Sequence, residues 1–194
     1  MRKELEVQPA VFPMPVLIVA AYDEAGTVQA MNAVWGTICG MDRIALCIDE
    51  GHATTKAIRQ TGAFTASIAD VAHMDVADYY GIATGNKLPD KFAKSGYHAV
   101  RSGNVNAPII EEFPLAMECE LAEVVQTENM HAVVGCIVGV SVDEKVLGAD
   151  GKVDPVKLDA LTFDQFGHGY YATGEKVGLA WNAGVALAKA ARGK

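Results

Sequence analysis

The sequence predicts a β-rich fold that carries a few short helices. Its 194 residues include 19 glycines, and aromatic residues make up only 7%, a composition that fits strands joined by many tight turns. The clearest strand signal lies in residues 115–125 and 132–142, where apolar side chains recur at every second position on both sides of residues 126–130. This period of two predicts an antiparallel hairpin. In the second arm the apolar face consists of Val134, Cys136, Val138, Val140 and Val142.

Four earlier segments also have the pattern of strands. Residues 15–22 form a continuous apolar run, which predicts a buried strand, and residues 28–34 follow as a second strand after a turn at 23–27. Two shorter strands are expected at 43–49 and 63–68.

Helices are expected between these strands and near the C-terminus. Residues 54–61 and 72–80 have helical character, and each segment is followed by a glycine. Asp154-Pro155 is typical of a helix start, and the alanine-rich tail at 177–192 has a helical composition. Residues 82–108 are the least regular stretch, and a segment this long inside a compact domain more often serves a function.

Composition and charge exclude several classes of protein. Hydrophobic residues make up 51% of the chain, enough for a sizeable core, and we expect one domain over residues 1–194. The net charge of −8 argues against a nucleic-acid surface and against docking on anionic membranes. No apolar run approaches the roughly 20 residues of a membrane span, and no signal-type core follows the N-terminus. Four cysteines without paired spacing fit a reducing cytoplasm, where we expect the protein to reside.

Two short segments carry the candidate chemistry. Residues 28–37 lead from a strand into small residues, one amide, one indole and one hydroxyl, which together suit a flat heterocycle. Residues 51–56 are typical of a helix start, where unpaired N–H groups and the positive end of the dipole attract anions. Thr54 and Thr55 add hydroxyls there, and Lys56 adds a cation. Taken alone, the second segment is also explained by an ordinary capping threonine. Taken together, the two segments indicate bound flavin mononucleotide (FMN).

Several single side chains allow two interpretations. Asn32 stands at a strand end, where its amide pairs either with a ligand or with the local backbone. Trp35 either packs along a flavin ring or fills a core or subunit interface. Lys91 lies in the irregular region, where it either neutralises a phosphate or a reduced flavin, or is a solvated loop charge. Tyr170 and Tyr171 either cover a cofactor face or stabilise a dimer seam.

The sequence lacks the motifs that are typical of several other kinds of site. The five histidines are scattered, without HExxH and without the Cys/His spacing of a zinc site. A nucleophile elbow of the GxSxG type is missing, and so is a GxGxxG fingerprint after a strand. The helix start at 51–56 is not a P-loop, because it lacks the glycine-rich Walker pattern.

The order of these signals resembles that of the flavin reductase-like proteins with an FMN-binding split barrel, especially the flavoredoxin-type branch. The resemblance covers about residues 11–185, and Asp90-Lys91-Phe92 is its most specific motif. After Trp35 the chain departs from many relatives, which carry Ser or Pro-Pro where this chain has 36–42. The matching segments are 13–16, 31–35, 52–58, 84–92, 107–110 and 118–121.

The resemblance implies a mainly β fold, a six-stranded antiparallel Greek-key split barrel with peripheral α-helices. It also implies a homodimer with FMN near the subunit boundary. By position, the flavin ring would be held by Met31, Asn32, Ala33 and Trp35. Thr37, which offers a hydroxyl near Asn32, is a further cofactor-binding candidate. The phosphate would be held by His52, Thr54, Thr55 and Lys56, and Lys91 and Tyr171 would complete the pocket.

Three functions remain open from the sequence. The leading hypothesis is an oxidoreductase that moves electrons from NAD(P)H through FMN to an acceptor, with no side chain required as acid or base. The second is a flavoredoxin-type electron-transfer protein that takes electrons from a donor protein and has no nicotinamide site. The third is a barrel that binds another planar ligand, such as haem, although no histidine has an evident axial-ligand context.

Overall fold

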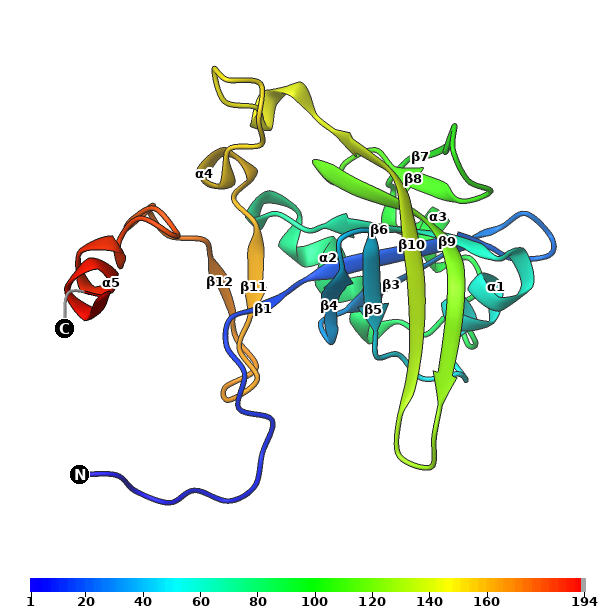
Figure 1. Ribbon diagram of the computed structural model, residues 1–194. Helices are drawn as coiled ribbons and strands as arrows, with labels where there is room; N and C mark the ends of the chain where they lie inside the picture. Colours follow the sequence, from blue (N-terminus) through cyan, green and yellow to red (C-terminus); the bar gives the residue numbers. More distant parts are fainter. Residues whose placement is uncertain (193–194) are drawn as a thin grey trace.

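The computed structural model describes residues 1–192, and its centre is a curled, antiparallel half-barrel sheet of seven strands (Figure 1). The strand order across the sheet is β3-β2-β6-β9-β10-β5-β4, so the long hairpin of β9 and β10 lies between strands from the first half of the chain. The bounds are β2 Leu17–Tyr22, β3 Val28–Ala33, β4 Gly36–Gly40, β5 Arg43–Leu46, β6 Ala63–Ile68, β9 Leu115–Gln126 and β10 His131–Val142.

The predicted fold class is confirmed, with one strand more in the main sheet than the six expected. The strand that the sequence pattern did not predict is β4, which forms the edge next to β5. Gly36 opens this strand, and a Cβ there would lie 2.6 Å from Leu17 Cδ1 and 2.8 Å from Leu46 Cδ2. A larger residue would have to displace these two buried leucine side chains, so the glycine suits the close packing of β4 on the core.

Two smaller sheets flank the main one. The first joins β1 (Met14–Pro15), β11 (Leu161–Phe163) and β12 (Tyr170–Ala172). The second is the hairpin of β7 (Ala99–Arg101) and β8 (Pro108–Ile110), which lies within the stretch that we expected to be irregular. Figure 1 shows the three-stranded sheet beside the half-barrel, between the barrel and the two chain ends.

The helices are short. Their bounds are α1 Ala53–Thr61, α2 Met74–Ile82, α3 Lys91–Ser95, α4 Pro155–Leu158 and α5 Val185–Arg192, with 3₁₀ turns at Val71–His73 and Glu144–Val146. Of these, α1, α2 and α3 pack against strands of the main sheet. As predicted, α1 ends at Gly62, which adopts the left-handed conformation with φ of 70°. Also as predicted, α4 follows Asp154, whose carboxylate accepts from the N–H of Val156. Among the helices of residues 1–192, none combines the length and apolarity needed to cross a bilayer.

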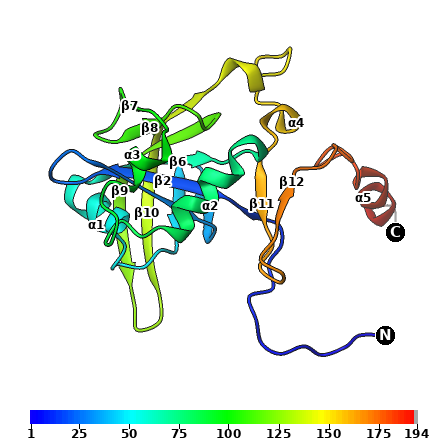
Figure 2. The same ribbon diagram turned by 180° about the vertical axis from the view of Figure 1, so that it is seen from behind.

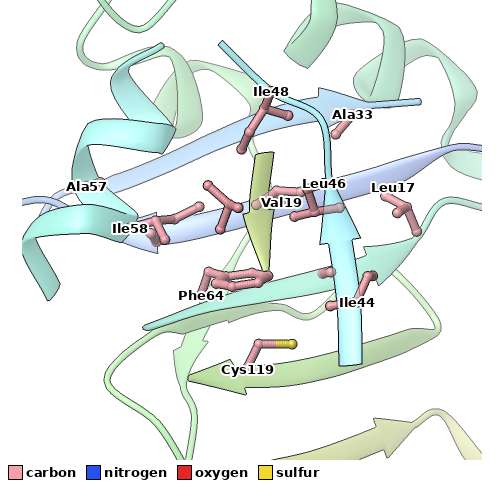
Figure 3. Packing of buried hydrophobic residues seen from close by; sticks show 13 residues of the cluster. Leu17, Val19, Ala33, Ile44, Leu46, Ile48, Ala57, Ile58, Phe64 and Cys119 are labelled. Carbon is pink, nitrogen blue, oxygen red and sulfur yellow. The ribbon is translucent and has the colours of Figure 1, made fainter. Parts of the chain in front are cut away.

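The hydrophobic core has two parts that meet at β2. Inside the curled sheet, side chains from β2, β5, β6 and β9 point toward one another, with Ile58 of α1 closing one end (Figure 3). On the other face of β2, Ile18 packs with Ala77 and Tyr80 of α2. Both faces of β2 are therefore buried, which explains why its sequence is a continuous apolar run rather than an alternating one.

The hairpin at 115–142 is confirmed, but the predicted apolar face of its second arm is wrong. Val133 is fully buried in the core, whereas Val138 and Val140 are 42% and 59% exposed. The register shifts between Val134 and Gly135 and again between Ile137 and Gly139. The first shift leaves Ala122 of β9 as the extra residue, and the second leaves Val138 of β10, which breaks the alternation of faces along β10.

Candidate functional site

One cavity of about 180 Å³ gathers groups from four parts of the chain. It lies between β3, the start of α1, the end of α2 with the loop that follows, and the first residue of α3. In Figure 2, which views the molecule from behind, α2 lies in front of the sheet. The lining residues are Met31, Asn32, His52, Ala53, Thr54, Tyr80, Gly81, Ala83, Thr84, Gly85 and Lys91.

The start of α1 forms the end of the cavity that suits an anion. His52 precedes the helix in an extended conformation, no side chain caps the first turn, and that turn contains no acidic residue. The first N–H groups of a helix have no partners within it, and they carry the positive end of the dipole. Thr54 and Thr55 are buried here, and Thr55 Oγ1 has no hydrogen-bond partner. The helix start thus offers donors that the protein itself leaves unused.

Asn32 presents an unused acceptor at the end of β3. Its Nδ2 donates to the carbonyl oxygen of Ala77 at 3.0 Å, whereas its buried Oδ1 has no partner. Burying an amide oxygen without a hydrogen bond is unfavourable. Because Asn32 also lines the cavity, a ligand with an N–H donor is the group that would satisfy Oδ1.

Lys91 places an ammonium group at the wall of the cavity. Its residue is only 3% exposed, and its Nζ donates to the carbonyl oxygens of Ala83 at 2.7 Å and Tyr80 at 3.2 Å. Burial lowers the pKa of Lys91 to about 8. Within residues 1–192 no carboxylate lies at ion-pair distance from this lysine. The charge is therefore available to an anionic ligand.

Gly85 allows the loop after α2 to approach the start of α1. A Cβ at this position would lie 2.6 Å from Gln29 Oε1 and 2.9 Å from Ala53 Cβ. Gln29 is buried, and its Oε1 is another side-chain atom without a partner. The glycine thus helps to shape the wall between the loop and the helix.

The structure brings five of the eleven predicted site residues together around the cavity: Met31, Asn32, His52, Thr54 and Lys91. Of the other ring candidates, Ala33 is buried in the core inside the sheet. Trp35 is half-exposed, and its indole Nε1 donates to Gln165 Oε1 at 3.0 Å. Thr37 lies exposed on the edge strand β4.

The three remaining candidates also lie outside the lining. Thr55 is buried in the first turn of α1, next to the lining residue Thr54. Lys56 is exposed, and its Nζ donates to Asn86 Oδ1 at 3.4 Å. Tyr171 is about half exposed and packs edge-on against Phe12, with 5.5 Å between the ring centroids.

Sequence reasoning missed the residues that α2 and its following loop contribute to the cavity. Tyr80 and Gly81 stand on a segment that was recognised only as a short helix. The sequence signal for the loop was Thr84-Gly85, because these two residues begin the segment 84–92 on which the family resemblance rests. Its second half supplied Lys91, but its first half was not assigned a role.

The comparisons with known proteins agree with this fold. A model of the flavin reductase like domain matches residues 10–173, most of the chain. The chain belongs to the flavin reductase-like family. Among solved structures, this family member is similar to flavoredoxin of Desulfovibrio vulgaris (Miyazaki F), with 35% identity and a TM-score of 0.90 over 95% of this chain and 100% of that one.

Two further similarities are more distant. Flavoredoxin from Methanosarcina acetivorans has the same fold, with a TM-score of 0.85, 23% identity, and coverage of 96% of this chain and 100% of that one. An uncharacterized protein of Aeropyrum pernix is 29% identical over 124 residues, which are 63% of this flavin reductase-like chain. The match spans 46% of that relative, so less than half of its length is represented here.

Proposed function

We propose that this flavin reductase-like protein binds FMN in the cavity and uses it to pass electrons from a donor to an acceptor. The observation that carries the proposal is the convergence of unused polar groups on one cavity. The uncapped start of α1 with the buried Thr55 hydroxyl beside it, the unpartnered Asn32 oxygen of β3 and the Lys91 ammonium of α3, which has carbonyl partners but no carboxylate at ion-pair distance within residues 1–192, lie at or next to this cavity. Native proteins rarely leave such groups unsatisfied, so their clustering supports a polar, anionic ligand.

In this proposal the two ends of the site bind different parts of FMN. The phosphate is assigned to the start of α1, with His52, Thr54, Thr55 and Lys56 around it. A dianionic group there gains from the helix dipole and from several N–H donors at once. The flavin ring is assigned to the other end, where Met31 supplies apolar contact and Asn32 a hydrogen-bond acceptor.

The protein's own contribution to electron transfer is to bind and tune the flavin. When bound, FMN supplies a ring that accepts and gives up electrons, which no side chain of the site can do. Lys91, held by two backbone carbonyls, stabilises negative charge on the ligand without needing to move. We assign no acid or base role to any side chain.

Two electron donors are compatible with this site. We propose NAD(P)H as the donor, which makes the protein a flavin oxidoreductase. The alternative is an electron-transfer protein that is reduced by another protein, and the similarity to a flavoredoxin along the whole of that chain favours it. Stopped-flow mixing of the FMN-loaded protein with NADH and with NADPH separates the two. Rapid bleaching of the flavin absorbance supports the oxidoreductase, and no bleaching with either nucleotide supports the carrier.

We further propose that the protein is a homodimer, because much of its apolar surface has no contact within the chain. All residues from 174 to 191 are exposed, including Trp181 at 98%, and this C-terminal arm extends away from the half-barrel (Figures 1 and 2). The body of the protein in turn exposes Ile38 of β4 and Val138 and Val140 of β10. Apolar surface of this extent is typical of subunit interfaces.

The assembly is tested by light scattering after size-exclusion chromatography. A dimer mass is expected for the wild type, and Trp181→Ser is expected to shift the equilibrium toward the monomer. Val100→Ser removes a 43%-exposed valine from β7 and serves as the matched control. A monomeric wild type would contradict the dimer.

The four cysteines are all free thiols in the structure, which supports a cytoplasmic location.

A further inference from the structure

We propose that Tyr170 and Asp78 are positioning residues that lock the Asn32 amide so that the site selects ligands with an N–H donor at the ring end. The proposal rests on the proposed function and deepens it. Tyr170 comes from β12 of the three-stranded sheet, Asp78 from α2, and Asn32 from β3. These hydrogen bonds connect the small sheet to Asn32, which lines the cavity.

The network has a defined direction. The Tyr170 hydroxyl donates to Asp78 Oδ1 at 2.9 Å, and an ionised carboxylate can only accept. Burial, followed by the effect of Asp78, raises the pKa of Tyr170 to about 12, so the phenol keeps its proton at neutral pH. With that proton committed to Asp78, the phenol oxygen is left as an acceptor. It receives a long hydrogen bond of 3.5 Å from Asn32 Nδ2.

The second acceptor for the amide is a backbone carbonyl. Asn32 Nδ2 also donates to the oxygen of Ala77 at 3.0 Å, so both of its hydrogens are directed toward acceptors. Rotating the amide by half a turn would place Oδ1 against the Ala77 carbonyl and the Tyr170 oxygen, where no donor is available. Asn32 Oδ1 is therefore held away from these groups, buried and without a partner.

This orientation defines the ligand chemistry at the ring end. A lone acceptor favours a ligand that brings an N–H group, and the edge of an oxidised flavin has one such group, the imide N–H. A flavin methylated at the imide nitrogen retains its shape and charge elsewhere but loses the donor. With the methylated ligand bound, Asn32 Oδ1 would remain buried without a hydrogen bond. A polar site discriminates in this way against an analogue that lacks the matching donor.

A purely structural role for Tyr170 is the competing explanation. Its ring packs against Phe163, with 5.9 Å between centroids, in the cluster that also contains Tyr97. Tyr97 is partly buried in the same cluster, and its hydroxyl makes no hydrogen bond within residues 1–192. Tyr97→Phe is therefore the matched control for Tyr170→Phe. Asp78→Asn is a second variant, because an amide at position 78 can donate to the phenol oxygen and compete with Asn32 for it.

The experiment measures the affinity of each apoprotein for FMN and for imide-methylated FMN by quenching of flavin fluorescence. The wild type is expected to prefer FMN by about tenfold or more, the effect of one buried hydrogen bond. Tyr170→Phe and Asp78→Asn are expected to lower this preference to about threefold or less, with apoprotein melting curves that show a folded chain. Tyr97→Phe is expected to retain the wild-type preference.

The outcomes separate the two levels of the proposal. A wild-type protein without saturable FMN binding would overturn the proposed function itself. A wild type that binds FMN and its methylated form equally would overturn the acceptor assignment for Asn32. Full preference in both Tyr170→Phe and Asp78→Asn would leave Asn32 as the acceptor and overturn the positioning role. An equal loss in Tyr97→Phe would show that removing any hydroxyl from this cluster lowers the preference, and would overturn the positioning role.

Discussion

Replacing Lys91 with Met tests whether the buried ammonium group at the site lowers the free energy of unfolding of the apoprotein. The lysine is almost fully buried, and its pKa is lowered to about 8 from an ordinary value of 10.5. Below pH 8 it is protonated in both the folded and unfolded chains, so the full cost of burying the charge is present. Between pH 8 and 10.5 the unfolded chain binds more protons than the folded one, so the stability of the apoprotein rises with pH.

The size of this effect follows from the pKa. Stability increases by about 1.4 kcal/mol for each pH unit in this window, or by about 3 kcal/mol in all. Lys91→Met removes the titrating group but leaves the carbonyls of Tyr80 and Ala83 without their donor, which costs about 1–3 kcal/mol. Near pH 7 these two effects oppose each other, so the variant is expected to be about as stable as the wild type. It is nevertheless expected to bind FMN at least tenfold more weakly, about 1.4 kcal/mol.

Urea unfolding of both apoproteins at pH 7, 8, 9 and 10 provides the assay. Other titrating groups are common to both chains, so the difference in unfolding free energy isolates Lys91. We expect the wild type to gain on the variant steadily above pH 8. A difference that stays constant from pH 7 to 10 would refute the argument, because Lys91 would then have the same pKa in the folded and unfolded chains.

Three further substitutions test individual contacts. Thr55→Val removes a hydroxyl that has no partner, so the apoprotein should lose little stability while FMN binds about tenfold more weakly; unchanged affinity by fluorescence titration would reject a phosphate contact. Gly85→Ala places a Cβ 2.6 Å from Gln29 Oε1, so it should displace the loop at 83–85 and weaken FMN binding, with Gly103→Ala, where a Cβ meets nothing within 4 Å, as control. Gly135→Ala places a Cβ against Phe64 Cζ, well inside van der Waals contact, and should lower the free energy of unfolding in urea by about 1–3 kcal/mol, whereas equal stability would show that the Phe64 ring moves freely.

The strands were predictable from sequence where burial alone determines the pattern. The continuous apolar run of β2 corresponds directly to burial of both faces, whereas in β9 Cys119 of the predicted apolar face is buried but so is Glu118 of the opposite face. In β10 the same reasoning chose the wrong face, because apolar residues stand on both faces of the strand and the extra residue Val138 interrupts the alternation. The edge strand β4 was missed because its side chains are largely exposed, so it has no burial pattern to detect.

The candidate site was predictable in its parts but not in its assembly. Asn32, Thr54 and Lys91 each carry a local signal, namely a polar side chain at the end of a strand, at a helix start or in an irregular segment. Tyr80 carries none, because an aromatic residue in a helix usually belongs to a core, and the signal of Tyr170-Tyr171 allowed a cofactor or dimer role but did not predict a contact with Asn32. Tyr170 contacts Asn32 of β3, which is distant in sequence, and the carbonyl of Tyr80 accepts from Lys91 of α3, and both contacts form only in the folded chain.

The most direct test of the central claim is a titration of the apoprotein with FMN and with riboflavin, which lacks the phosphate. If one cavity binds the ring at Asn32 and the phosphate at the start of α1, fluorescence quenching should saturate at one FMN per chain. FMN should then bind at least tenfold more tightly than riboflavin, about 1.4 kcal/mol. Quenching that does not saturate, or equal affinity for the two flavins, would contradict the account.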